Sequence, residues 1–327
     1  MTKSHAGRKG GERMIIFENL SFDPFFNQAF EEVLFETDFD DDVFFLWRNS
    51  PAVVVGCYQN ICREVKIEAL RKENIPVIRR ITGGGTVYHD LGNVNYTMIL
   101  QHQSSADYDR CLTPMIAALN ALGIPAHKNR TCDIAIDGQK ISGSAQKLAH
   151  GRLLHHGTLL FDADLSRLDK ITTHHKNEHF QIKGILSDIC PVTNICRHLK
   201  KPLAIETFMA QLTQQMAENA QPRLLTDDQK ARLLALRDEK YTGWEWTWGN
   251  TPPFTYEKHG TFCGQPIQIA YQAKRGMISD AQIDCAAIDP KLASELLNRA
   301  RLDPAELACI CQKLAGSHQD ELLDLLI

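Results

Sequence analysis

The sequence lacks any apolar stretch that could cross a lipid bilayer, because none of its runs approaches the roughly 18 residues that a membrane span needs. It also lacks an excess of positive charge: 36 Lys and Arg residues face 40 Asp and Glu residues, for a formal net charge of -4. The net charge therefore gives no electrostatic sign of nucleic-acid binding. With 43% hydrophobic and 23% charged residues, the composition is that of an ordinary soluble globular protein.

Paired metal-binding cysteines are missing as well. The ten cysteines are scattered, none forms a Cys-x-x-Cys pair, and a chain of 327 residues needs no disulfides to fold. We therefore expect reduced thiols and a cytoplasmic protein. His174, His175 and His179 lie beside Glu178, but no second group of metal ligands follows at a recognisable spacing. This cluster is interpreted as a solvated loop.

The first 13 residues lack the apolar region of a secretory signal. They are basic and rich in glycine, so we expect a disordered tail over residues 1–13. A mitochondrial transit peptide is the alternative, but the segment is short and has no amphipathic period. Met14 opens the first apolar run, MIIFENL.

The remaining sequence predicts an α+β fold. Short β-branched and aromatic runs predict strands, and apolar residues at helical spacing predict helices, among them 63–74 and 108–122. The segment WEWTWGNTPPF, beginning at residue 244, is aromatic and rich in proline, as is typical of a boundary between domains. Beyond it we expect two or three strands and two helices, near 292–301 and 304–314. The predicted organisation is a mixed-sheet domain over residues 14–245 and a small α+β domain over residues 253–327.

The densest motif is RRITGGGTVYHDLGN, which begins with Arg79 and Arg80. Three successive glycines at the end of a strand cost conformational entropy, so another interaction must offset them. Backbone amides without side chains in the way can surround an anion, and the arginines can add charge-assisted hydrogen bonds to phosphate or carboxylate. The motif therefore favours an anion-binding turn; a flexible hinge or a strained turn is the alternative.

A second motif, DGQKISGSAQ, contains Lys140 among small residues on a predicted hairpin with Asp137 and Gly138 at its turn. A lysine there can approach a ligand as a point cation, or it can simply face solvent. Asp133 lies on the paired strand. Its carboxylate can hold Mg²⁺, or it can be a surface acid beside a turn.

Together, RRITGGGTVYHDLGN, CDIAIDGQKISGSAQ and HHGTLLFDADLSRL resemble the successive motifs of the lipoate-protein ligase A family. Later stretches also fit, namely residues 183–185, residues 192–195 and WEWTWGNTPPF. The resemblance implies a fold shared with biotin-protein ligases and octanoyl transferases, and a C-terminal domain that moves during the reaction. It also implies two steps: lipoate and ATP give lipoyl-AMP and pyrophosphate, and an acceptor lysine then takes the lipoyl group. The family's acceptors are lipoyl domains of 2-oxoacid dehydrogenase complexes and the glycine cleavage H protein.

The resemblance also implies roles for individual residues. The catalytic residue is Lys140, which matches the family lysine that contacts both ATP and the lipoyl carboxyl group. Nucleotide binding falls to Arg80, Gly83, Gly84, Gly85, Thr86, Val87, Tyr88 and Lys140. Lipoate binding falls to Arg80, Gly85, Lys140, Ser142, Ala145, His156 and Gly157. Asp133 matches an acid that holds Mg²⁺ near the phosphates. His156 can equally be a core histidine with satisfied hydrogen bonds.

One position departs from the family pattern, because Cys132 stands where the family usually has asparagine. This raises an alternative function: transferases of the same fold form a thioester on a cysteine, here Cys132 or Cys190, and use no ATP. The arginine and glycine motif and the C-terminal domain fit ATP use better. Two further alternatives are a non-catalytic binder of lipoate or lipoylated proteins and a biotin ligase. The chain lacks the Gly-Arg-Gly loop that biotin ligases typically carry.

Overall fold

The computed structural model describes residues 14–172, 180–181, 190–218 and 220–327. The tail of residues 1–13, the histidine cluster at 174–179 and the motif at 183–185 lie outside the described residues. No helix in the described part of the chain is long and apolar enough to cross a membrane.

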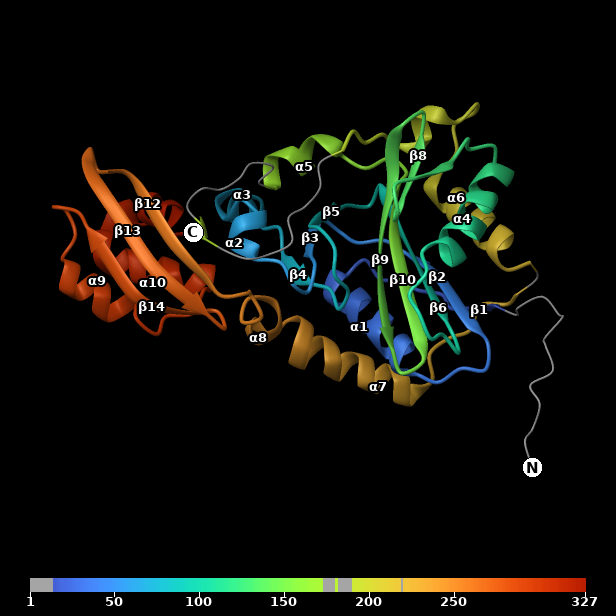
Figure 1. The fold of residues 1–327 in the computed structure, drawn as a ribbon, viewed down its shortest axis with the longest axis horizontal. Helices are drawn as coiled ribbons and strands as arrows, with labels where there is room; N and C mark the ends of the chain where they lie inside the picture. Colours follow the sequence, from blue (N-terminus) through green and yellow to red (C-terminus); the bar gives the residue numbers. More distant parts are fainter. Residues whose placement is uncertain (1–13, 173–179, 182–189, 219) are drawn as a thin grey trace.

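A seven-stranded mixed sheet forms the centre of the larger part of the molecule (Figure 1). Only the β1–β2 pair is parallel; every other neighbouring pair is antiparallel. In spatial order the strands are β1 (Met14–Ile16), β2 (Asp42–Trp47), β6 (Asn93–Leu100), β10 (Arg152–Leu160), β9 (Gln139–Ala149), β8 (Asp133–Ile136) and β7 (His127–Asn129).

Helices cover both faces of this sheet because its strands alternate apolar side chains between two cores. On β2, Phe44 and Leu46 belong to the core under α4 (Asp109–Ala121) and α6 (Ile205–Met216). Val43, Phe45 and Trp47 belong to the core under α1 (Pro24–Glu36) and α7 (Asp227–Leu236). The helix α1 begins as predicted: Asp23 accepts a hydrogen bond from the backbone N–H of Phe25, and Pro24 occupies the first turn.

A separate three-stranded sheet carries the glycine motif. Its order is β4 (Val77–Arg79), β3 (Ala52–Val55) and β5 (Val87–His89). The helix predicted over 63–74 is wrong as a single element, because the chain forms α2 (Ile61–Glu64) and α3 (Ile67–Glu73). Val65 lies between them and makes a β-bridge to Thr172, which α5 (Leu165–Ile171) precedes. This long-range pairing interrupts the helical periodicity.

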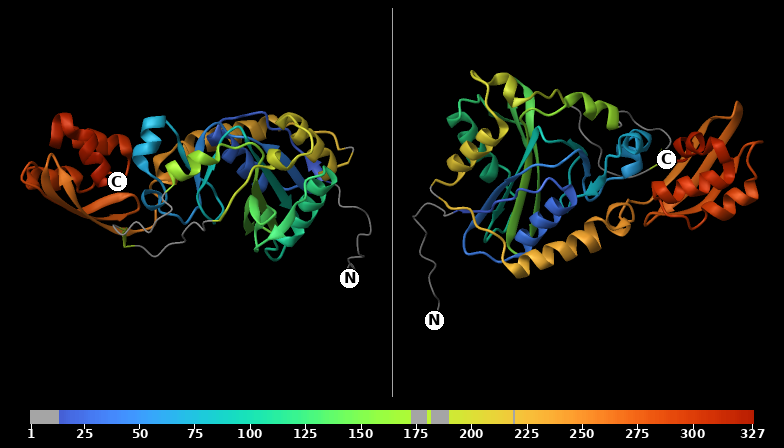
Figure 2. Two further views of the ribbon diagram at one scale, coloured as in Figure 1. Left: turned by 90° about the horizontal axis from the view of Figure 1, so that it is seen from above. Right: turned by 180° about the vertical axis from the view of Figure 1, so that it is seen from behind.

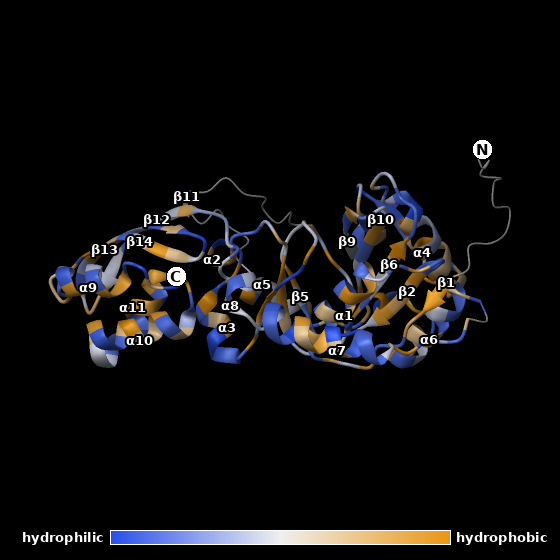
Figure 3. Cartoon of the chain, turned by 90° about the horizontal axis from the view of Figure 1, so that it is seen from below, coloured by the Kyte–Doolittle hydropathy of each residue, from blue (hydrophilic) through white to orange (hydrophobic). Residues whose placement is uncertain are grey.

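The C-terminal part contains β12 (Phe254–Phe262), β13 (Gln265–Lys274) and β14 (Met277–Asp284), as predicted. The two predicted helices are present as α9 (Pro290–Leu297) and α10 (Pro304–Ala315), and a third, α11 (Gln319–Leu326), was not predicted. A fourth strand, β11 (Phe180–Gln181), comes from the preceding part of the chain and pairs with β12. Figure 3 shows apolar residues gathered along β1 and β2 of the main sheet and on α11.

The two parts lie side by side along the long axis of the molecule (Figures 1 and 2). The helix α8 (Trp244–Thr247) runs between them. Arg71 of α3 pairs with Asp320 of α11 at 2.9 Å, and Cys62 of α2 packs into the C-terminal core. The architecture is α+β, and the division into domains at residues 245 and 253 stays a prediction.

Candidate active site

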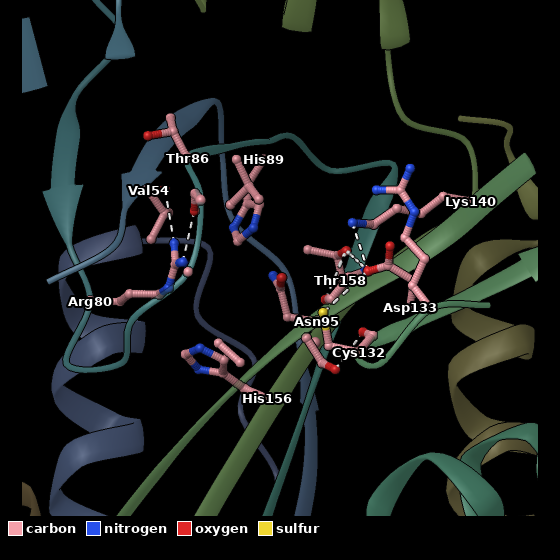
Figure 4. A pocket seen from close by; sticks show the side chains of 18 of the residues that line it. Val54, Arg80, Thr86, His89, Asn95, Cys132, Asp133, Lys140, His156 and Thr158 are labelled. Carbon is pink, nitrogen blue, oxygen red and sulfur yellow. Dashed lines mark hydrogen bonds and ion pairs between the residues drawn. The ribbon is translucent and has the colours of Figure 1, made fainter. Parts of the chain in front are cut away.

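A pocket opens between the glycine motif and the main sheet. It is a cavity of about 480 Å³, within the range typical of small-molecule sites. Its wall combines residues of α1, β2, β3, β5, β6, β8, β9 and β10 with the turn after β4 and residues 130–132. In Figure 4 Arg80 lies on one side of this pocket and Lys140 on the other, with His89 and Asn95 between them.

The turn after β4 requires glycine at Gly84. Its φ angle is +91°, and a Cβ there would lie 2.9 Å from Nη2 of Arg80. Gly56, just after β3, is equally constrained, because a Cβ there would lie 2.2 Å from the carbonyl oxygen of Gly84. Two segments thus approach each other closely only because neither has a side chain at the contact.

Arg80 organises this turn from inside. Its guanidinium donates to the carbonyl oxygens of Gly83 (2.6 Å) and Gly85 (2.7 Å) and to Thr82 Oγ1 (3.0 Å). The side chain is buried, and burial lowers its pKa to about 10, so it remains charged at neutral pH. No carboxylate of the described residues forms an ion pair with it. The carbonyl groups do not neutralise the positive charge of Arg80, so this charge can attract an anionic ligand.

Lys140 and Asp133 form the opposite side. They lie on the paired strands β9 and β8, and Nζ of Lys140 is 2.8 Å from Oδ1 of Asp133. Asp133 is almost fully buried, whereas a quarter of the Lys140 side chain is exposed. Gly143 makes room for the ammonium group, because a Cβ there would lie 2.7 Å from Nζ. The pair therefore presents a cation to the cavity and a carboxylate behind it.

A chain of hydrogen bonds fixes His156 against the wall. Its Nδ1 lies 2.9 Å from the fully buried carboxylate of Glu31, and its Nε2 lies 2.7 Å from Thr82 Oγ1. With the proton on Nδ1, Arg80 donates to Thr82, Thr82 to His156, and His156 to Glu31. Thr97 donates to the same carboxylate at 2.7 Å. His156 is thus both a satisfied histidine and part of the pocket wall.

His89 offers the pocket a hydrogen bond that the protein does not use. Asn49 Nδ2 donates to its Nδ1 at 3.1 Å, so the proton resides on Nε2. Burial, and then the charge of Arg80, lower its pKa to about 3, so the ring is neutral. Its Nε2 has no hydrogen-bond partner among the described residues, and neither do Gln28 Oε1 and Asn95 Nδ2, which line the same cavity. Buried polar atoms of this kind are rare in folded proteins and indicate a ligand or water.

Cys132 lines the pocket, but its surroundings disfavour a thiolate. Burial and the neighbouring carboxylate of Asp133 raise its pKa, against a smaller opposing effect of Lys140. Cys190 is half-buried and does not line the pocket. Elsewhere in the described chain, one group of three exposed metal-ligand side chains lies on the C-terminal part, namely Cys263, His318 and Glu321.

The structure brings most of the predicted site residues into one cavity. Those that line it are Arg80, Gly84, Gly85, Thr86, Val87, Asp133, Lys140, Ala145, His156 and Gly157. Gly83, Tyr88 and Ser142 do not line it. Tyr88 alternates with Val87 and His89 along β5 and packs in the core around α2 and α3, while Ser142 is fully buried near Tyr96.

Sequence reasoning missed several lining residues, among them Gln28, Trp47, Val54, His89, Asn95 and Thr158. His89 lies inside the quoted glycine motif, and its place two residues after Val87 on a strand was a usable indication. Gln28 and Trp47 look like ordinary members of an apolar helix and an apolar strand, so nothing local distinguishes them.

An α+β fold whose cavity has a cationic side chain on each of two opposite sides is typical of an enzyme that binds anionic substrates. The family model of the lipoyl protein ligase A/B catalytic domain matches residues 23–217. Lipoate-protein ligase LplJ of Bacillus subtilis is 31% identical over 281 residues, which cover 83% of this chain and 84% of that protein. Lipoate–protein ligase 1 of Staphylococcus aureus is 33% identical over 273 residues, covering 82% and 83%. The chain belongs to the lipoate-protein ligase family of the biotin/lipoate ligase superfamily, and it is a ligase.

Solved structures agree in fold. Plasmodium falciparum LipL1 in complex with lipoate has a TM-score of 0.61 at 22% identity, covering 97% of this chain and 99% of that one. A lipoate-protein ligase A bound with ATP has a TM-score of 0.60 at 23% identity, covering 72% and 98%. A bipartite lipoate protein ligase of Thermoplasma acidophilum, described with its E2 lipoyl domain, has a TM-score of 0.63 at 21% identity, covering 72% and 96%.

Proposed function

We propose that this enzyme uses ATP to convert lipoate to lipoyl-AMP and then transfers the lipoyl group to a lysine of a lipoyl-domain protein. One observation carries the proposal: Arg80 with its glycine turn and Lys140 with Asp133 face the same cavity from opposite sides (Figure 4). Relatives named for lipoate ligation, and solved neighbours bound with ATP or with lipoate, support both substrates.

The first step needs two anions to meet. The lipoate carboxylate attacks the α-phosphorus of ATP, a bond forms between carboxylate oxygen and phosphorus, and pyrophosphate leaves. Lys140 is the catalytic residue, because its ammonium group contacts both reactants and offsets their repulsion and the charge that builds at the α-phosphoryl group. Arg80 and the amides of Gly84 and Gly85 hold the nucleotide, which orients the phosphate in line with the attack.

Asp133 is suited to hold Mg²⁺. Its carboxylate is buried, lines the cavity and lies beside the cation that contacts the phosphates. Mg²⁺ in nucleotide sites uses one or two carboxylates together with phosphate oxygens and water, so a single acid fits. The metal would supply charge neutralisation on the phosphates, and Asp133 would exchange part of its contact with Lys140 for the metal.

The acyl chain lies along the wall formed by Ala145, His156 and Gly157. Gly157 lines this wall with its backbone and leaves room for the buried ring of Tyr96, which a Cβ there would approach to 2.6 Å. In the second step the neutral amine of the acceptor lysine attacks the acyl carbon and AMP leaves, its phosphate still paired with Lys140. Lipoyl domains of 2-oxoacid dehydrogenase complexes are the proposed acceptors, since the Thermoplasma acidophilum ligase is described with an E2 lipoyl domain. The glycine cleavage H protein is a further proposed acceptor, by resemblance alone.

A cysteine-based transferase is the competing function, because Cys132 lies in the pocket. Burial and the Asp133 carboxylate raise the pKa of this thiol by more than Lys140 lowers it, so the thiol has no net activation. The ligase hypothesis therefore expects Cys132→Ser and Cys190→Ser to remain active with ATP.

The test is pyrophosphate release from the purified enzyme with ATP, Mg²⁺ and lipoate, followed by mass analysis of an added lipoyl domain. We expect release only when lipoate is present and acyl transfer only when ATP is present. Modification of the lipoyl domain without ATP, from a lipoylated or octanoylated donor protein in place of free lipoate, would instead establish the transferase.

A further inference from the structure

The two arginines of the glycine motif face different parts of the molecule. Arg80 lines the cavity, whereas Arg79 does not. Arg79 is fully buried, and no carboxylate of the described residues pairs with it. Burial lowers its pKa to about 10. A charge held in the interior without a counter-ion is costly, so its hydrogen bonds have to compensate.

One side of the Arg79 guanidinium holds the segment after β3. Its Nη1 donates to the carbonyl oxygens of Gly56 (2.9 Å), Cys57 (3.3 Å) and Gln59 (2.8 Å). These three carbonyls belong to one tight loop, so a single nitrogen fixes the loop's shape. A lysine has only one nitrogen, so it could not hold this loop and also make the contacts that the other two guanidinium nitrogens make.

This loop supports the glycine turn directly. Gly56 packs against the carbonyl group of Gly84, because a Cβ at Gly56 would lie only 2.2 Å from that oxygen. Gln59 Oε1 accepts hydrogen bonds from the backbone N–H of Gly56 (2.9 Å) and from Thr86 Oγ1 (2.9 Å). Moving the loop therefore moves Gly84 and Thr86, which line the cavity.

The other side of the Arg79 guanidinium holds the segment between the two parts of the molecule. Nε donates to the carbonyl oxygen of Thr247 (2.9 Å), and Nη2 donates to Thr251 Oγ1 (3.3 Å). In return, Trp246 Nε1 donates to the backbone carbonyl of Arg79 at 2.7 Å. Both threonines are buried.

The same segment is fixed to the C-terminal part. Trp244 Nε1 donates to the carbonyl oxygen of Leu302 (3.2 Å), and the Trp244 ring fills the space beside Gly276, where a Cβ would lie 2.7 Å from it. Trp248 packs against both the C-terminal core and the core around α2 and α3. Arg79 thus contacts the C-terminal part through the 244–251 segment, and it contacts the glycine turn through the Gly56–Gln59 loop.

We propose that Arg79 is a positioning residue that couples the glycine turn to the 244–251 segment. Nucleotide affinity then depends on the contacts that this segment makes with Arg79. The inference rests on the proposed function in that it takes ATP as the ligand of the glycine turn. Arg79 touches neither substrate; it acts through the Gly56–Gln59 loop.

The first test measures the dissociation constant of ATP by equilibrium dialysis, without lipoate. Arg79→Lys should weaken ATP binding by about tenfold or more, since it removes several charged hydrogen bonds from the loop and the segment. Thr251→Val removes only the segment's side-chain contact and should weaken binding by about threefold. Arg152→Lys is the matched control, because Arg152 is also buried but donates to Thr37, away from the turn, and should bind ATP normally.

The double variant distinguishes coupling from general damage. If Thr251 acts through Arg79, combining Thr251→Val with Arg79→Lys should weaken ATP binding no further than Arg79→Lys alone. Unchanged ATP affinity in Thr251→Val, fully additive effects, or an equal loss in Arg152→Lys would each overturn the proposal. Thr251→Val keeps the test valid if Arg79→Lys does not fold.

Hydrogen exchange gives an independent reading. ATP should slow amide exchange over residues 244–251 in the natural protein, and this protection should disappear in Thr251→Val while protection at the glycine turn persists. Equal protection of residues 244–251 in both proteins would contradict the coupling. A natural protein that binds ATP but releases no pyrophosphate with lipoate would refute the proposed function and leave this test intact.

Discussion

Replacing Lys140 with methionine removes the ammonium group that pairs with Asp133 at the cavity wall. The methionine side chain has nearly the same length, so the change deletes charge and leaves volume almost unaltered. Loss of one preorganised group that stabilises transition-state charge typically lowers kcat by about 10²- to 10³-fold, or roughly 2.7 to 4 kcal/mol. We expect a loss of at least this size in lipoate-dependent pyrophosphate release.

The same variant also affects stability, because it leaves the Asp133 carboxylate without the ammonium group now 2.8 Å away. A buried charged group that loses such a hydrogen bond costs roughly 1 to 3 kcal/mol. The Lys140 side chain is one quarter exposed, so water relieves part of this cost and the lower half of the range applies.

A double variant separates the two effects. Lys140→Met combined with Asp133→Asn removes both charges, and urea unfolding should return toward the natural value while pyrophosphate release stays lost. Lys140→Arg keeps the charge and should retain more activity than Lys140→Met. If Lys140→Met releases pyrophosphate at the natural rate, Lys140 has no part in the chemistry and the reasoning fails.

Three further predictions concern the surroundings of the site. Gly157→Ala places a methyl group 2.6 Å from the ring of the fully buried Tyr96. The free energy of unfolding in urea should fall by roughly 1 to 3 kcal/mol, and lipoate should bind more weakly in calorimetry. An unchanged free energy of unfolding would show that the strand shifts without cost and would contradict this prediction. Burial lowers the pKa of His155 to about 3, below its unfolded value of 6.5, so its contribution to stability is present above pH 6.5 and is lost as pH falls toward 3. Unfolding free energy should therefore drop by roughly 2 kcal/mol from this residue between pH 6.5 and pH 5, and His155→Gln should show a smaller acid loss than the natural protein, not an equal one. Because Asp133 raises the pKa of the Cys132 thiol, Asp133→Asn should speed alkylation of Cys132 at pH 8, followed by peptide mass analysis; a slower reaction would contradict that electrostatic effect.

Features set by neighbouring residues were predictable from the sequence. The start of α1 at Asp23 and Pro24, the β8–β9 hairpin with its Asp137–Gly138 turn, and the three strands of the C-terminal part all depend on local periodicity or turn chemistry. The glycine motif and Lys140 were also recognisable, because three successive glycines after two arginines, and a lysine among small residues, are unusual local sequences.

Features set by contacts between distant segments were not predictable. The strand β11 is two residues long and exists because it pairs with β12, and the helix over 63–74 is divided by a bridge from Val65 to Thr172. Glu31 reaches His156 across 125 positions of sequence, so nothing near either residue announces their contact.

The two arginines of the motif illustrate the same limit. Successive residues of a strand point to opposite faces, so only one of Arg79 and Arg80 could enter the cavity. The sequence gives no sign of what the other would contact, since Thr247 and Thr251 lie more than 160 positions away along the chain. The sequence predicted that both arginines can contact an anion, but only Arg80 lines the cavity.

The central claim is that the lipoate carboxylate attacks the α-phosphorus of ATP inside the cavity shared by Arg80 and Lys140. Lipoate labelled with oxygen-18 in its carboxylate tests it most directly, with ATP, Mg²⁺ and a lipoyl domain present and the products analysed by mass spectrometry. The account predicts AMP that carries one labelled oxygen, because that oxygen bridges carbon and phosphorus before the acceptor amine expels AMP. Lipoylated product accompanied by unlabelled AMP, or formed without AMP at all, would contradict it.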